Sequence, residues 1–218
     1  MDLIFDSSLV LYLPLYNLDG ASFMSRDAYG HRCTVTGAVW RLNGCRFDET
    51  DDRITVGAAG DAELAGLTDT TILVWACPSS LASENKSIIS KNNRAGEDRY
   101  NLLIQTTGAP QFFYENNNNV VSVTGSAGVV TVNSWYFFSC RFGNGGVKLE
   151  TNLGDQVTNA DTNVMRSEDG TAKPLYIGRD YNNDFEFGGV VGEVFIYNRC
   201  LTNGEIQQNY LATKGRYR

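Results

Sequence analysis

The sequence predicts an all-β protein, a two-sheet antiparallel β-sandwich of jelly-roll type with one short C-terminal helix. Asn, Asp and Gly cluster between short apolar runs, and this arrangement is typical of a chain with many tight turns. The chain has 22 Gly but only 4 Pro. Its 11 Tyr, 11 Phe and 3 Trp supply enough large side chains to fill the space between two packed sheets. These features favour strands over helices.

The expected strands are short apolar or alternating segments, each bounded by turn residues. Many of them recur at the spacing of roughly 8 to 12 residues that is usual in a sandwich. They cover residues 8–15, 33–37, 45–48, 53–56, 71–77, 87–91, 100–105, 111–115, 135–142, 147–151, 175–178 and 190–197.

Two of these segments have a more specific interpretation. Residues 71–77 are apolar at nearly every position, which predicts a central strand covered on both faces. Residues 135–142 and 147–151 flank a Gly-Asn-Gly-Gly run at 143–146. Glycine adopts positive φ values at little cost, so this run predicts the clearest hairpin of the chain.

One helix is signalled, over about residues 203–212. Thr202 and Glu205 have the spacing of a capping box, and Leu201 and Ile206 have that of a hydrophobic staple. The helix follows the last expected strand, so Ile206 and Tyr210 are expected to cover a sheet end. Its predicted role is structural.

The length of the chain indicates its domain organisation, and its net charge argues against some classes of function. A β-sandwich of 218 residues is commonly one unit, and no repeat or linker divides the chain, so a single domain over 1–218 is expected. The net charge of −7 and the absence of a basic stripe argue against binding nucleic acid or anionic lipid. The apolar runs are too short to form a membrane-spanning helix. The N-terminal residues do not have the pattern of a secretory signal.

The five cysteines are an odd number and include no Cys-x-x-Cys pair. The expected state is therefore buried free thiols, without a zinc site or a disulfide framework. Cys33 and Cys45 flank an expected hairpin, so a disulfide between them stays open as an alternative.

Several segments, in their order and spacing, resemble the laminin-G-like, pentraxin-like members of the concanavalin A-like lectin and glucanase superfamily. Residues 47–54 resemble a Phe-Asp-Gly-x-Asp-Asp-Tyr-Ile run, with Glu49 in place of the usual Gly and Arg53 in place of the usual Tyr. The most specific segment is 192–202, which resembles Asp/Gly-Glu-Val-Arg-Ile-Tyr-Asn-Arg-Ala-Leu-Ser. Residues 71–75, 135–137 and 175–178 resemble three further strands of this family.

The resemblance implies two curved antiparallel sheets, recognition of a glycan or a protein through loops, and often a structural calcium ion. Calcium prefers carboxylate and carbonyl oxygens from loops. The expected ligands are Asp19, Asp27, the backbone near Gly30, Asp48 and Asp51. Gly192 stands where the family often has Asp, so one carboxylate is missing, and solvated turn residues are the competing explanation.

The sequence lacks the signatures of the relevant hydrolases. A retaining glucanase needs two paired carboxylates, and the nearest acidic segment, 49–54, has Arg and Ile where the second Glu would lie. No Gly-x-Ser-x-Gly segment is present to partner His31, which is expected to be a solvated loop residue. We therefore expect no enzymatic activity.

A sugar-binding surface is expected to combine an aromatic ring with amides and carboxylates. The loop at 179–185 has this composition and supplies the candidates Asp180, Tyr181, Asn182, Asn183 and Asp184. A second group is Tyr114 with Asn117. The competing interpretation is that these residues form turns and cover the end of the sandwich.

Two functions from different classes follow. The first is a non-catalytic, lectin-like module that binds carbohydrate through loops at the sandwich edge. The second is a structural or adhesion subunit, such as a virus or phage decoration or fibre protein, that assembles through protein contacts. The partner is then a glycan or a protein, with a homo-oligomer left open. The family favours an extracellular or virion-surface location.

Overall fold

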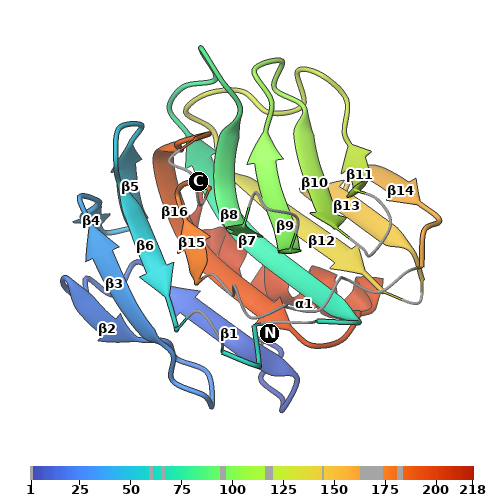
Figure 1. Cartoon of the computed structure of the whole chain (residues 1–218), viewed down its shortest axis with the longest axis horizontal. Coiled ribbons are helices and arrows are strands. Elements are labelled where there is room, and N and C mark those ends of the chain that lie inside the picture. The colour runs from blue at the N-terminus through green and yellow to red at the C-terminus, as the bar shows by residue number, and fades with distance from the viewer. Residues whose placement is uncertain are drawn as a thin grey trace.

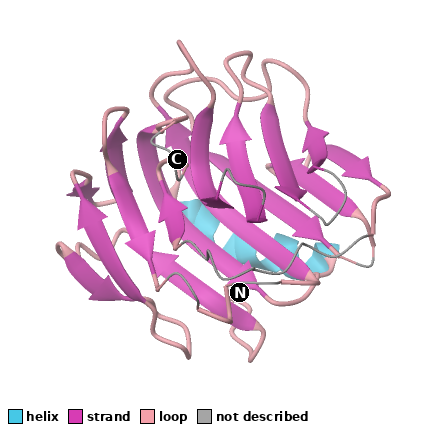
Figure 2. Cartoon of the chain, in the orientation of Figure 1, coloured by secondary structure: helices cyan, strands magenta, loops and turns pink. Residues whose placement is uncertain are grey.

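The structure is a computed structural model that describes residues 2–58, 61–64, 67–93, 97–115, 120–143, 145–162, 174–180 and 184–218. Two antiparallel sheets of eight strands each pack face to face (Figure 1). One helix lies outside the sandwich, behind the strands in Figure 2. The predicted two-sheet antiparallel sandwich with a C-terminal helix is confirmed. No described helix is long and apolar enough to cross a membrane.

We call the sheet that carries the helix the helix-covered sheet. Its strand order is β14 (Asp155–Asn159), β13 (Val147–Thr151), β12 (Tyr136–Phe142), β7 (Thr70–Pro78), β16 (Gly188–Tyr197), β5 (Gly44–Asp48) and β4 (Val39–Arg41), with β1 (Leu9–Pro14) paired to β16.

The other sheet is the second sheet. Its strand order is β11 (Val120–Thr124), β10 (Pro110–Glu115), β9 (Glu97–Ile104), β8 (Lys86–Asn93), β15 (Leu175–Ile177), β6 (Arg53–Val56), β3 (Arg32–Thr36) and β2 (Ser22–Met24).

All of the expected strands are present, but four strands were missed. These are β2, β4, β11 and β14, and each is the edge strand of its sheet. Edge strands are partly exposed and are kept short or polar to prevent further pairing, so they lack the apolar run that marks a buried strand. The burial of β2 and β4 illustrates this, since only Phe23 of their six residues is buried.

The two structural features with specific sequence signals form as predicted. Strand β7 lies between β12 and β16, and every residue in it is buried except Cys77. Strands β12 and β13 form the predicted hairpin, in which Arg141 pairs with Lys148. Gly143 and Gly146 have φ values of +145° and +81°, which explains the need for glycine in this connection.

The core lies between the two sheets and is rich in aromatic rings. Phe142 of β12 is fully buried, and its ring stacks on those of Tyr114 and Phe112 from the second sheet at centroid distances of 5.2 and 5.8 Å. A second apolar cluster lies on the opposite face of the helix-covered sheet. Both faces of the central strands in this sheet are therefore buried.

The C-terminal helix α1 (Asn203–Thr213) seals this second cluster. Both halves of the predicted capping box are present between Thr202 and Glu205, and Leu201 and Ile206 are both buried. The helix is followed by a 3₁₀ turn, η1 (Lys214–Arg216). The helix covers the face of the sheet formed by β1, β7, β12 and β16, which is a wider surface than the predicted sheet end.

The cysteines are all free thiols, but the expectation that they are buried holds for only three of them, because Cys77 is half-buried and Cys200 is exposed. Cys33 lies on β3 of the second sheet and Cys45 on β5 of the helix-covered sheet, so the hairpin expected between them does not form. Strand β3 pairs instead with β2 and β6, and β5 pairs with β4 and β16. Burial raises the pKa of each of these two thiols to about 12.

Glu49, which stands where the related family usually has Gly, has a left-handed backbone with φ of +68°. This conformation costs a non-glycine residue roughly 1–2 kcal/mol. The Glu49 carboxylate lies 3.4 Å from Nζ of Lys86, whose side chain is almost completely buried. The substitution therefore supplies a counter-charge to a buried lysine.

Candidate functional site

The loop at 179–185 was the first predicted binding region. Of its candidates, Asp180 and Asp184 are described, whereas Tyr181, Asn182 and Asn183 lie outside the described residues. Asp180 is only 1% exposed, and its carboxylate accepts a hydrogen bond of 3.0 Å from the backbone N–H of Asp184. The described part of the loop therefore uses Asp180 to shape the turn, as the competing interpretation expects.

Tyr114, the aromatic candidate of the second predicted region, is a core residue. Its side chain is completely buried, and its ring packs on Phe142. Its hydroxyl donates to Oδ1 of Asp161 at 3.4 Å, and burial together with the Asp161 charge raises the Tyr114 pKa to about 12. The ring offers no face on which a sugar can stack. Asn117 lies outside the described residues.

Of the expected calcium ligands, Asp19 and Asp27 are engaged with other groups. Asp19 forms an ion pair with Arg26 at 2.6 Å. The Asp27 carboxylate accepts hydrogen bonds from the backbone N–H groups of Tyr12, Tyr29 and Gly30 at 2.9 to 3.1 Å. Asp27 therefore organises the connection that leads into β3.

Asp48 lies away from Asp19 and Asp27, so the expected calcium ligands do not form one site. The Asp48 backbone N–H donates to Oδ2 of Asp52. The next residue, Arg53, pairs with Thr36 at the end of β3, whereas Asp27 lies before the start of β3. Carboxylate oxygens of Asp48, Asp51 and Asp52 lie within 4.8 Å of one another. Burial and the Asp48 charge raise the pKa of Asp52.

The expectation that His31 is a solvated loop residue is wrong. His31 is 6% exposed. Its Nδ1 lies 3.0 Å from Oδ2 of Asp61, and its Nε2 lies 2.9 Å from the Val10 carbonyl oxygen. Both ring nitrogens are thus used to join the start of β3 to β1 and to the segment after β6. This arrangement gives His31 a structural role.

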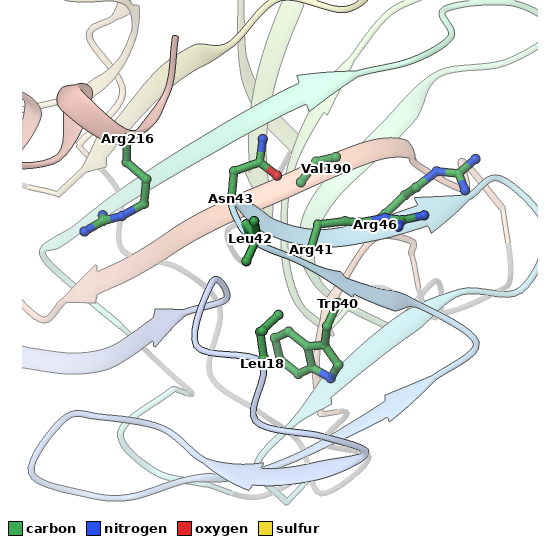
Figure 3. A pocket seen from close by; sticks show the side chains of 8 residues that line it. All are labelled: Leu18, Trp40, Arg41, Leu42, Asn43, Arg46, Val190 and Arg216. Carbon is green, nitrogen blue, oxygen red and sulfur yellow. The ribbon is translucent and has the colours of Figure 1, made fainter.

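A pocket of about 820 Å³ lies at the β4 edge of the helix-covered sheet, and we call it the β4–β5 pocket (Figure 3). Its volume is within the range of small-ligand sites. Four parts of the chain meet there: the connection between β1 and β2, the β4–β5 hairpin, the adjacent β16, and η1. The lining residues are Leu18, Trp40, Arg41, Leu42, Asn43, Arg46, Val190 and Arg216.

The β4–β5 hairpin is held closely against β16, which fixes the position of the pocket. Gly44, with φ of +154°, directly follows the turn, and a Cβ atom at this position would collide with the Val191 carbonyl oxygen. Leu42 and Asn43, the two turn residues, therefore project beside Val190 on a rigid support. Leu42 is 86% exposed.

Trp40 forms one wall of the pocket, with Leu18 beside it (Figure 3). The indole Nε1–H donates to the Gly20 carbonyl oxygen at 3.0 Å, and the ring packs edge-on against Phe23 at 5.4 Å. Leu18 has a left-handed φ of +58° and is half exposed. Strained residues of this kind tend to gather at functional sites.

Three arginines give the pocket its charge. Arg216 of η1 is fixed, because its Nη1 donates to the buried carboxylate of Glu193 at 3.1 Å and its guanidinium lies 3.7 Å from the Tyr16 ring centroid. Arg41 and Arg46 are exposed, and neither side chain forms a hydrogen bond or ion pair in the described part of the chain. No described acidic residue lines the pocket.

Sequence reasoning missed this pocket because it missed β4. Trp40 and Arg41 lie on that short edge strand, whose three residues carry no alternating apolar pattern. The Asn43-Gly44 dipeptide is a turn signal that could have located the hairpin. Arg216 and Leu18 join the site only through the fold.

The chain belongs to the concanavalin A-like lectin/glucanases superfamily. The model of one of its families, a laminin-G-like domain, matches residues 48–207, which is more than half of the chain. The resemblance found in the sequence motifs is thereby confirmed. A comparison with curated proteins finds no match.

Solved structures with the same fold include a sialidase from Trypanosoma rangeli, in complex with a difluorinated sugar acid. It has a TM-score of 0.73 and 14% identity over 97% of this chain and 34% of its own. The botulinum neurotoxin serotype G binding domain has a TM-score of 0.73 and 12% identity over 93% and 50% of the two chains. The receptor-binding domain of botulinum neurotoxin D gives 0.70 and 15% over 95% and 53%. This chain thus spans between a third and about half of these proteins.

Proposed function

We propose that this chain is a non-catalytic, lectin-like recognition domain that binds carbohydrate in the β4–β5 pocket. The observation that carries the proposal is the combination of an indole wall, a turn amide and two arginines, Arg41 and Arg46, that have no partner among the described residues. Apolar side chains such as Trp40 and Leu42 suit the C–H faces of a sugar ring, and the Asn43 amide can pair with hydroxyls. The rigid hairpin holds these groups in place before a ligand binds.

The structural neighbours support recognition as the role. Two of them are described as the binding domain and the receptor-binding domain of neurotoxins. A non-catalytic role is supported by the pocket itself, since most glycoside hydrolases of the retaining or inverting type use a pair of carboxylates. The described lining of the pocket contains none.

The alternative is a structural or adhesion subunit that assembles through protein contacts. It is favoured by the apolar side chains exposed around the pocket, with Leu42 at 86%, Leu18 at 50% and Val39 at 49% exposure. Exposed apolar groups gathered on one surface are typical of protein interfaces. In this alternative the pocket residues contact a protein and no glycan.

A glycan array tests the proposed function, with Asn43→Ala as the pocket variant. We expect binding by the wild type and about a 3- to 10-fold loss in Asn43→Ala, because one net hydrogen bond to the sugar is removed. Gln156→Ala is a matched control, since Gln156 is an exposed amide on β14 at the opposite edge of the same sheet. It should bind as the wild type does.

The carbohydrate proposal fails if folded, monomeric wild-type protein binds nothing on the array in calcium or in chelator. A concentration-dependent increase in mass by light scattering under the same conditions would support the structural alternative. Loss of that increase in Leu42→Ser would then locate the protein contact at the same pocket, since Leu42 is its most exposed apolar residue.

We separately propose a structural calcium ion, with Asp48, Asp51 and Asp52 as its ligands. Three converging carboxylates fit the ligand preference of this cation. Calcium is expected to raise the melting temperature of the wild type, and Asp51→Asn is expected to reduce that increase because Asp51 is exposed and supplies one carboxylate. Equal melting temperatures in calcium and in chelator would contradict this site.

A further inference from the structure

We propose that the ligand of the β4–β5 pocket is an acidic polysaccharide built from uronic-acid units, bound through its carboxylates by Arg41 and Arg46. This inference rests on the proposed carbohydrate-binding function and specifies its ligand class. The proposal is carried by the positive charge of the pocket, which is opposite in sign to the net charge of the whole chain.

Arg41 and Arg46 form a pair of neighbouring like charges. In the β4–β5 ladder Arg46 lies opposite Val39, and Arg41 is two residues from Val39 on the same face. Side chains in this diagonal relation are within reach of each other. Two guanidinium groups that have no partner in the described part of the chain repel each other, so an anion placed between them is favoured.

A third cation lies across the pocket from this pair. Figure 3 shows Arg216 on the far side of Leu42 and Asn43 from Arg41 and Arg46. Arg216 is anchored by Glu193 and Tyr16, so its position does not depend on a ligand. The Glu193 carboxylate balances the Arg216 charge, but the Arg216 guanidinium keeps further N–H groups that can donate to a sugar. Donors on both sides of Leu42 and Asn43 fit a chain of several sugar units better than a single sugar.

The charge balance favours carboxylates over dense sulfates. The whole chain has a net charge of −7, which repels polyanions at long range. Among the lining arginines, only Arg41 and Arg46 oppose this charge, because Arg216 is paired with Glu193. A polymer with one carboxylate on each sugar can contact Arg41 and Arg46, and the acidic protein repels it less than it repels a densely sulfated polymer. The planar guanidinium also matches the two oxygens of a carboxylate.

The test is a calorimetric titration with a mannuronate hexamer in chelator at low salt, beside a neutral dextran oligomer and a dextran sulfate of similar length. We expect the mannuronate to bind more tightly than the other two ligands. Arg41→Gln and Arg46→Gln should each weaken binding of the mannuronate about tenfold, the loss expected when one charge-assisted contact is removed. Added salt should weaken it further.

Arg32→Gln is the matched control, because Arg32 is exposed and lies on β3 of the second sheet. It should bind the mannuronate as the wild type does. Circular dichroism spectra and melting temperatures equal to those of the wild type establish that the variants are folded. The exposed positions of Arg41 and Arg46 make this outcome expected.

Each contrary result has its own meaning. Equal binding of neutral and acidic oligomers, or tighter binding of the sulfate, overturns the uronic-acid inference but leaves the carbohydrate function standing. Mannuronate binding that is unchanged in both Arg41→Gln and Arg46→Gln also overturns it. The absence of any glycan binding on the array overturns the proposed function and this inference together.

Discussion

Phe142→Ala is expected to lower the free energy of unfolding by about 3–5 kcal/mol, the range usual for a fully buried aromatic ring. Phe142 is 0% exposed and lies on β12, where its ring contacts Tyr114 and Phe112 of the second sheet. Its removal leaves a cavity between the two sheets, which strands on both sides hold open. Urea denaturation followed by circular dichroism measures the change.

Leu42→Ala is a control for this measurement, because Leu42 is 86% exposed and buries little surface. Its free energy of unfolding should change by no more than about 0.5 kcal/mol. If Phe142→Ala cost no more than Leu42→Ala, the packing of the two sheets against each other at Phe142 would be contradicted.

Trp75→Ala is expected to have an effect of similar size, about 3–5 kcal/mol, on the opposite face of the helix-covered sheet. The Trp75 indole Nε1–H donates to Oγ1 of Thr213 at 2.7 Å, and the ring stacks on Tyr210 and Tyr217 at 5.5 and 4.7 Å. These contacts hold α1 and the C-terminal residues on the sheet. Urea denaturation gives the size of the loss.

Trp75→Phe separates the ring contacts from the hydrogen bond. It keeps an aromatic ring in the cluster but cannot donate to Thr213, so we expect a smaller loss of about 1–2 kcal/mol. A Trp75→Phe variant as unstable as Trp75→Ala would show that the rings of Tyr210 and Tyr217 contribute little. Retention of wild-type stability in Trp75→Ala would contradict the docked helix.

The buried elements were predictable because each has a local signal. The continuous apolar run of β7 marks a strand covered on both faces, and the glycines at 143, 145 and 146 mark the β12–β13 hairpin. Thr202 and Glu205 mark the start of α1. In each case the residues that determine the structure are neighbours in the sequence, so tertiary contacts were not needed to infer them.

The pocket was not predictable in the same way. Leu18, Trp40 and Arg216 are far apart in the sequence and meet only because β4 pairs with β5 and the C-terminal turn folds back over the sheet. Tyr114 shows the opposite error. A Tyr beside a polar loop is typical of a binding site, but the Tyr114 ring lies in the core. The alternation of side chains along β10 points the Tyr114 ring inward, and the residue types of the segment do not indicate that direction.

An NMR titration of ¹⁵N-labelled protein with a glycan that binds on the array tests the β4–β5 pocket most directly, since it shows where the sugar lies. We predict that the largest shift changes fall on backbone amides of Leu18 and of residues 40–46, and on the Trp40 indole N–H. Changes centred instead on the loop at 179–185 or on residues 114–119 would contradict the β4–β5 pocket as the recognition site.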